Sequence, residues 1–204
     1  MIDRLLQWMV GLPEALIYAV VGAFAALENV FPPVPADVVA LFGGFLAGRG
    51  AANAWVTFLV VWLCNVTGAM TVYALGRRYG TAFFRNRVGS LILQPGQFAR
   101  LSEFYARHGE KVIFISRFLP MFRAVVPIFA GTSKLGWVRT LVPLAVASGL
   151  WYGGIVYLGA TAGRNWADIR RVVDASGHWL AVPAGILLVV FAWWWWHTRR
   201  RGKP

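Results

Sequence analysis

The segment that most constrains the fold of this sequence is 111–131, KVIFISRFLPMFRAVVPIFAG, where two arginines and two prolines interrupt an apolar run. Arg117 and Arg123 would each cost about 3 kcal/mol at the centre of a bilayer, so we expect them to face protein or water. Pro120 and Pro127 each remove a helical N–H and clash with the preceding turn. We therefore predict a broken helix, folded into a hairpin, whose break turns both guanidinium groups toward one site.

A second interpretation of this segment is a single kinked helix whose arginine side chains extend to one membrane interface. Broken helices at membrane depth occur where the backbone is buried in protein or lines a cavity. The hairpin therefore implies a break that is buried in protein or lines a cavity.

The composition is that of a protein that crosses the membrane several times. Hydrophobic residues make up 58% of the 204 residues, charged residues only 14%, and the mean hydropathy is +0.59. Several apolar runs exceed the roughly 20 residues needed to cross the hydrocarbon core. We predict a single membrane domain over 1–204, with transmembrane spans at about 5–27, 54–76, 139–162 and 179–197.

The net charge of +12 follows from the connections between the apolar runs, so we do not expect nucleic acid as a partner. The predicted connection 77–111 is mainly basic, and the chain ends in RRRGKP. Basic segments beside spans stay in the cytoplasm, which with four spans places both termini there. Cys64 is the only cysteine, so we expect neither a disulfide framework nor a cysteine metal cluster, and no cofactor.

A second broken segment, ENVFPPVPAD at 28–37, carries two acids, Glu28 and Asp37. Its three prolines are Pro32, Pro33 and Pro35. The uncharged stretch after Asp37 is too short to span, which favours a second re-entrant hairpin over about 28–50, beside the first over about 111–134. The alternative is a surface loop with two ordinary acids.

The two broken segments are similar in layout. Leu46-Ala-Gly and Phe129-Ala-Gly each close a hairpin, and each is followed by a tryptophan and then a long span. The charge distribution gives the two copies opposite orientations. The predicted fold is therefore an all-α integral membrane protein, an inverted repeat of re-entrant hairpin plus transmembrane helix with additional flanking transmembrane helices. In such repeats the binding site lies where the breaks converge, which places the two acids opposite the two arginines.

The segment SRFLPMFRAVVPIFAG, residues 116–131, resembles the signature of the DedA family of bacterial membrane proteins, which is related to the VTT-domain lipid scramblases. ENVFPPVPAD resembles the first acidic hairpin of that family. The resemblance implies a bacterial inner-membrane location and movement of undecaprenyl phosphate to the cytoplasmic face. It also implies that Glu28 and Asp37 are the essential acids and Arg117 and Arg123 the essential arginines. One departure is Asp37, where many members have glutamate.

Our leading hypothesis is a lipid-phosphate flippase. Arginine binds phosphate through a planar fork and keeps its charge, so Arg117 and Arg123 could take the headgroup while the lipid chain stays in the bilayer. Glu28 and Asp37 would then act in gating or proton coupling. The expected partner is a membrane lipid, either a polyprenyl phosphate or a phospholipid, and the sequence leaves open both proton coupling and a homodimer.

Two other functions come from different classes. A proton-coupled antiporter of small cations or drugs would use the two acids for binding and the arginines for electrostatic tuning. A membrane lipid phosphatase would need a nucleophile and a base, but the three histidines, His108, His178 and His197, lie away from both hairpins. Ser116 has no histidine within its motif. We therefore expect no catalytic residue, no metal and no enzyme activity.

Overall fold

The computed structural model describes residues 10–31, 34–79, 109–119 and 123–176, and within these ranges all regular structure is helical. The helices are α2 (Glu14–Leu27), α3 (Ala36–Gly48), α4 (Ala54–Tyr79), α8 (Val126–Thr132), α9 (Trp137–Arg164) and α10 (Trp166–Ser176). Residues 109–116 are also helical. The predicted last span, 179–197, and most of the basic connection lie outside the described residues.

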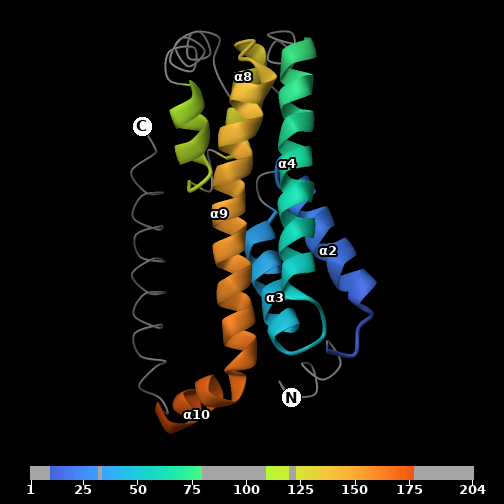
Figure 1. Cartoon of the computed structure of the whole chain (residues 1–204), viewed down its shortest axis with the longest axis vertical. Coiled ribbons are helices and arrows are strands. Elements are labelled where there is room, and N and C mark those ends of the chain that lie inside the picture. Colours follow the sequence, from blue (N-terminus) through green and yellow to red (C-terminus); the bar gives the residue numbers. More distant parts are fainter. Residues whose placement is uncertain (1–9, 32–33, 80–108, 120–122, 177–204) are drawn as a thin grey trace, which may run out of the picture. The chain divides into compact units, whose positions relative to one another are not determined.

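Two helices, α4 and α9, are long and apolar enough to cross a membrane, and their ranges are close to the predicted spans 54–76 and 139–162. They run antiparallel, because the start of α4 and the end of α9 line one groove and the Trp62 Nε1 donates to the Ala145 carbonyl near their middle. Figure 1 shows them side by side.

The surfaces of α4 and α9 have the polarity expected in lipid rather than in water. Large apolar side chains on both helices are exposed, among them Leu63 at 54% and Leu150 at 61%. Polar side chains on the same helices are buried, among them Asn65 and Ser148 at 1% each. An apolar exterior around a polar interior is stable only when hydrocarbon surrounds the protein, because exposed apolar area of this extent is unfavourable in water.

The first helical hairpin consists of α2 and α3. Pro13 precedes α2, which fits the preference of proline for the region before the first helical turn. The first part of α2 lies beside Asn53, whose backbone N–H donates to the Tyr18 hydroxyl over 2.8 Å. Helix α3 ends at Gly48, close to the same end of α4, which begins at Ala54. The tip of this hairpin, near Glu28, lies beside the middle of α4.

The second helical hairpin consists of residues 109–116 and α8. Its two ends meet at Leu135, which lies against Gly109 and accepts a hydrogen bond from the Tyr73 hydroxyl. This hairpin therefore approaches from the opposite end of α4, and the described residues at its tip, 117–119 and 123–125, face the tip of the first hairpin. In Figure 1, α8 lies beside the end of α4, whereas α2 and α3 lie beside its first half.

Each hairpin packs against the long helix that follows the other hairpin. On α3, Gly48 meets the Ala160 carbonyl of α9, and on α8, Gly131 meets the Tyr73 carbonyl of α4. The long helices present glycine in return, because Gly163 meets the Phe45 carbonyl and Gly76 meets the Ile128 carbonyl. Leu46-Ala-Gly and Phe129-Ala-Gly therefore make equivalent contacts. Close approach of helix backbones through small residues is the usual way helices associate in membranes.

The first helix differs from the predicted span over 5–27. Its continuous part begins at Glu14 and contains 14 residues, fewer than a full crossing needs. Residues 11–12 form a turn before Pro13, which explains the late start. Residues 1–9 lie outside the described residues, and the cytoplasmic position of the N-terminus stays a prediction.

The hairpin geometry predicts where three side chains are accessible. We expect cysteines placed at Glu14 and Asn53 to react with an impermeant thiol reagent from the same side of the membrane, and a cysteine at Lys134 from the other. Cys64 is replaced by serine in all three variants. Labelling of Glu14→Cys and Asn53→Cys from opposite sides would contradict a hairpin formed by α2 and α3.

Candidate functional site

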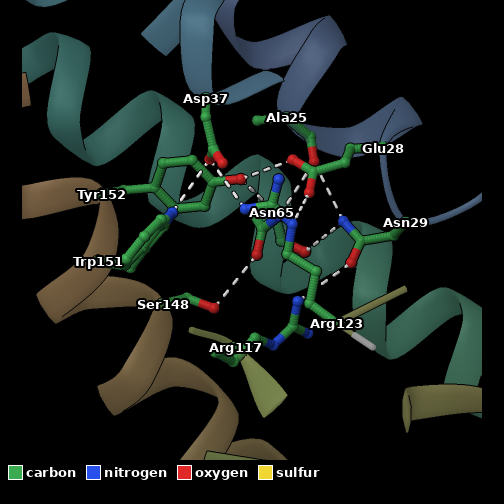
Figure 2. A network of polar contacts seen from close by, with 10 residues as sticks. All are labelled: Ala25, Glu28, Asn29, Asp37, Asn65, Arg117, Arg123, Ser148, Trp151 and Tyr152. Carbon is green, nitrogen blue, oxygen red and sulfur yellow. Dashed lines mark hydrogen bonds and ion pairs between the residues drawn. The ribbon is translucent and has the colours of Figure 1, made fainter. Parts of the chain in front are cut away.

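Arg123 is the centre of a buried charged cluster where the tips of the two hairpins meet (Figure 2). Its Nη1 lies 2.8 Å from Asp37 Oδ1, and its Nε forms an ion pair with Glu28 Oε1. The Arg123 and Glu28 side chains are 8% and 3% exposed, whereas the Asp37 side chain is 27% exposed. The cluster is therefore closed around Glu28 and reachable at Asp37.

Glu28 and Asp37 reach Arg123 because of how the first hairpin ends its helices. Glu28 directly follows α2, and its backbone N–H still donates to the Phe24 carbonyl, so its side chain projects from the last turn. Asp37 lies in the first turn of α3, after Pro35. A carboxylate at that position interacts favourably with the positive end of the helix dipole.

Arg117 lies beside Arg123 (Figure 2) but forms no ion pair within the described residues. It is 3% exposed, and its Nη1 donates to Asn29 Oδ1 at 3.4 Å. Its Nη2 has no hydrogen-bond partner among the described residues. Glu28 Oε1 and Arg123 Nε also lack a hydrogen bond, but they form an ion pair with each other. Arg117 Nη2 is therefore the buried donor among the described residues that has no acceptor. Such groups are uncommon in proteins and require an explanation.

Two consecutive residues of α9 supply uncharged donors to the two acids. Tyr152 donates its hydroxyl to Glu28 Oε2 at 2.8 Å, and the Trp151 Nε1 donates to Asp37 Oδ1 at 3.0 Å. Each carboxylate therefore forms an ion pair with Arg123 and accepts one hydrogen bond from α9.

A further set of polar groups lies behind Tyr152. Asn65 of α4 donates through Nδ2 to the Tyr152 hydroxyl and to the Ala25 carbonyl, each over 3.2 Å. Ser148 donates to Asn65 Oδ1 over 3.2 Å. The cluster is thus linked to both long helices by hydrogen bonds.

The predicted residues are therefore placed unequally. The structure brings Glu28, Asp37 and Arg123 into direct contact and leaves Arg117 beside them without a carboxylate partner. Pro35 precedes α3 and Pro127 lies in the first turn of α8, where proline is tolerated. Pro32, Pro33 and Pro120 lie outside the described residues.

Five residues of the cluster were missed by sequence reasoning: Asn29, Asn65, Ser148, Trp151 and Tyr152. Asn65 carried a usable signal, because an amide in the middle of an apolar span needs partners inside the protein. Trp151 and Tyr152 carried none, since aromatic residues are common throughout this chain.

A helical protein with an apolar exterior and a buried charged cluster between two opposed hairpins belongs to the class of polytopic membrane proteins. Residues 34–161 match the VTT domain, and the chain belongs to this family, which includes the DedA proteins. The predicted family is confirmed. No solved structure matches the chain.

Several bacterial membrane proteins are similar to this chain over most of their lengths. "Uncharacterized membrane protein YkoX" of Bacillus subtilis is 30% identical, covering 89% of this chain and 80% of that protein. "Undecaprenyl phosphate transporter A" of Staphylococcus aureus is 24% identical, covering 91% and 94%. "Alkaline phosphatase-like protein" of Lactococcus lactis is 27% identical, covering 85% and 83%.

Proposed function

We propose that this protein is a flippase that moves a lipid phosphate, most specifically undecaprenyl phosphate, across the bacterial inner membrane. The observation that carries the proposal is the Arg117 guanidinium, which is buried, charged and lacks an acceptor for its Nη2 among the described residues. A phosphate group suits a buried guanidinium, because its negative charge matches and two of its oxygens can accept the parallel hydrogen bonds of the planar fork.

Arg123 is the second binding group of the proposed site. Its charge is satisfied by Glu28 and Asp37, so a phosphate must compete with two carboxylates for it. Protonation or displacement of the two acids would free the guanidinium for the headgroup. This competition supports the gating or proton-coupling role that we propose for the two acids.

The cluster suits a lipid better than a free ion because of its surroundings. Its hairpins and long helices expose apolar side chains outward, and the Asp37 side of the cluster is the more accessible one. A headgroup could enter beside Asp37 while its hydrocarbon chain remained in the bilayer. The similarity to a protein named undecaprenyl phosphate transporter A supports this lipid as the first to test.

The proposed arrangement in the membrane follows from the same geometry. Both hairpins are re-entrant, the end of α4 at Tyr79 faces the cytoplasm, and the loop between α3 and α4 faces the opposite side. The basic connection that follows α4 supports this orientation. The C-terminal tail is placed in the cytoplasm by its charge.

The phosphatase hypothesis gains little from the name of the Lactococcus relative, which is 27% identical. Ser116, the only candidate nucleophile in the motif, donates its hydroxyl to the Ile113 carbonyl and is 4% exposed. No group of three or more metal-binding side chains occurs within the described ranges. Transport is therefore the activity to be tested first.

Arg117→Lys is expected to abolish most transport while leaving the protein inserted and folded. Lysine keeps the charge, but its single ammonium cannot bind two phosphate oxygens through a planar fork. A loss on the order of tenfold or more is expected in liposomes containing undecaprenyl phosphate, since one charged hydrogen bond contributes about 1.5–3 kcal/mol.

The matched control is Arg139→Lys, because Arg139 is 73% exposed and pairs with Glu110 away from the cluster. Wild-type transport by Arg117→Lys would remove the phosphate-binding role of Arg117. Liposomes that contain only phospholipid, and liposomes with an imposed pH gradient, separate the substrates and the coupling. Movement of small cations without lipid movement would favour the antiporter.

A further inference from the structure

Trp151 and Tyr152 each donate a hydrogen bond to one of the two acids that pair with Arg123. Tyr152 reaches Glu28 Oε2, whereas Arg123 pairs with Oε1. Trp151 and Arg123 both donate to Asp37 Oδ1, over 3.0 and 2.8 Å. The acids therefore keep a hydrogen-bond donor if Arg123 moves away.

The direction of the Tyr152 hydroxyl is fixed by its neighbours. A phenol has one hydrogen to donate, and its oxygen can also accept. Because Asn65 Nδ2 donates to that oxygen, the single hydrogen points to Glu28. Ser148 in turn fixes the Asn65 amide by donating to its Oδ1.

Without a donor from α9, withdrawal of Arg123 would leave the buried Glu28 carboxylate without a hydrogen bond. Glu28 is 2% exposed, and a buried carboxylate without a donor is strongly destabilised. The other charged groups facing Glu28 are Asp37, which is also negative, and Arg117, which contacts Asn29 instead. Among the described residues, the Tyr152 hydroxyl of α9 is then the remaining hydrogen-bond donor to this carboxylate.

We propose that Trp151 and Tyr152 are positioning residues that hold Asp37 and Glu28, respectively, while Arg123 is released to the ligand. Trp151 acts on Asp37 alone, and Tyr152 acts on Glu28 alone. The inference rests on the proposed function only in naming a phosphate as the ligand that draws Arg123 away.

The test measures the reaction of each acid with dicyclohexylcarbodiimide, which attacks protonated carboxyl groups, followed by mass spectrometry of the purified full-length protein. Tyr152→Phe is expected to raise the labelling rate of Glu28 several-fold and to leave Asp37 unchanged. Trp151→Phe should have the reverse effect. Glu14 of α2 provides an internal reference for reagent activity.

The same comparison in an Arg123→Gln background reproduces withdrawal of the arginine without any ligand. There Tyr152→Phe should raise Glu28 labelling by about tenfold, because the lost bond was made to a charged group. The single variants retain Arg123 and keep the test decisive if the double variants do not fold.

Two matched controls report the loss of an equivalent bond elsewhere. Tyr73→Phe removes a buried hydroxyl that donates to the Leu135 carbonyl, and Trp62→Phe removes an indole N–H that donates to the Ala145 carbonyl. In both controls, the labelling rates of Glu28 and Asp37 should equal those of the wild type. The inference is overturned if Tyr152→Phe and Trp151→Phe give the same labelling rates as these controls, or if each variant raises the labelling rates of both acids equally.

A transport assay on the same variants separates the two proposals. If the wild type moves no lipid phosphate but the residue-specific labelling appears, the proposed function fails and the positioning role stands. If the wild type transports and the labelling does not change, the positioning role alone fails.

Discussion

Replacing Arg123 with glutamine is expected to lower the stability of the protein by about 3–5 kcal/mol and to abolish transport. Removing one partner of a buried ion pair leaves the other charge uncompensated, and that is the costly outcome. Here the change leaves two carboxylates, Glu28 and Asp37, of which Glu28 is almost fully buried. Thermal unfolding in detergent and abundance in the membrane both measure the effect.

A double variant distinguishes the electrostatic cause from a packing defect. Arg123→Gln with Glu28→Gln removes the buried carboxylate along with the cation, so it should regain part of the lost stability but no transport. Arg123→Lys keeps the charge yet cannot bridge both acids as the guanidinium does. Wild-type stability of Arg123→Gln would mean that the ion pair is not formed in the membrane.

The second large effect is expected at the glycines where a hairpin contacts the long helix that follows the other hairpin. Gly131→Ala would place a Cβ 2.2 Å from the Tyr73 carbonyl oxygen, and Gly163→Ala would place one 2.2 Å from the Phe45 carbonyl oxygen. Backbone atoms cannot move aside as side chains do, so the helices must separate. We expect each change to lower the free energy of unfolding by about 1–3 kcal/mol.

Gly154→Ala is the control for these variants, because it lies on α9 and has open space around its added methyl group. Alanine is the better helix former by about 1 kcal/mol, so this variant should be as stable as the wild type or more so. Stability is compared by thermal unfolding in the same detergent. Equal behaviour of all three variants would contradict the close contact between hairpins and long helices.

The sequence alone determined the local properties of this protein. The long helices α4 and α9 follow from uncharged runs of sufficient length, and the end of the helix 109–116 before Arg117 follows from the proline content of its segment. The four charged residues stood out because each is costly in an apolar environment. These signals need no knowledge of what lies nearby in space.

Only the tertiary structure decided which charges meet. Asp37 and Arg123 are 86 residues apart, and their contact depends on two hairpins that enter from opposite ends of α4. The same geometry gives Arg123 both acids and leaves Arg117 with Asn29. Tyr152 and Trp151 reach the acids only because α3 packs closely along α9 through glycine contacts. Partner choice in such a cluster is set by backbone packing, which local sequence patterns do not encode.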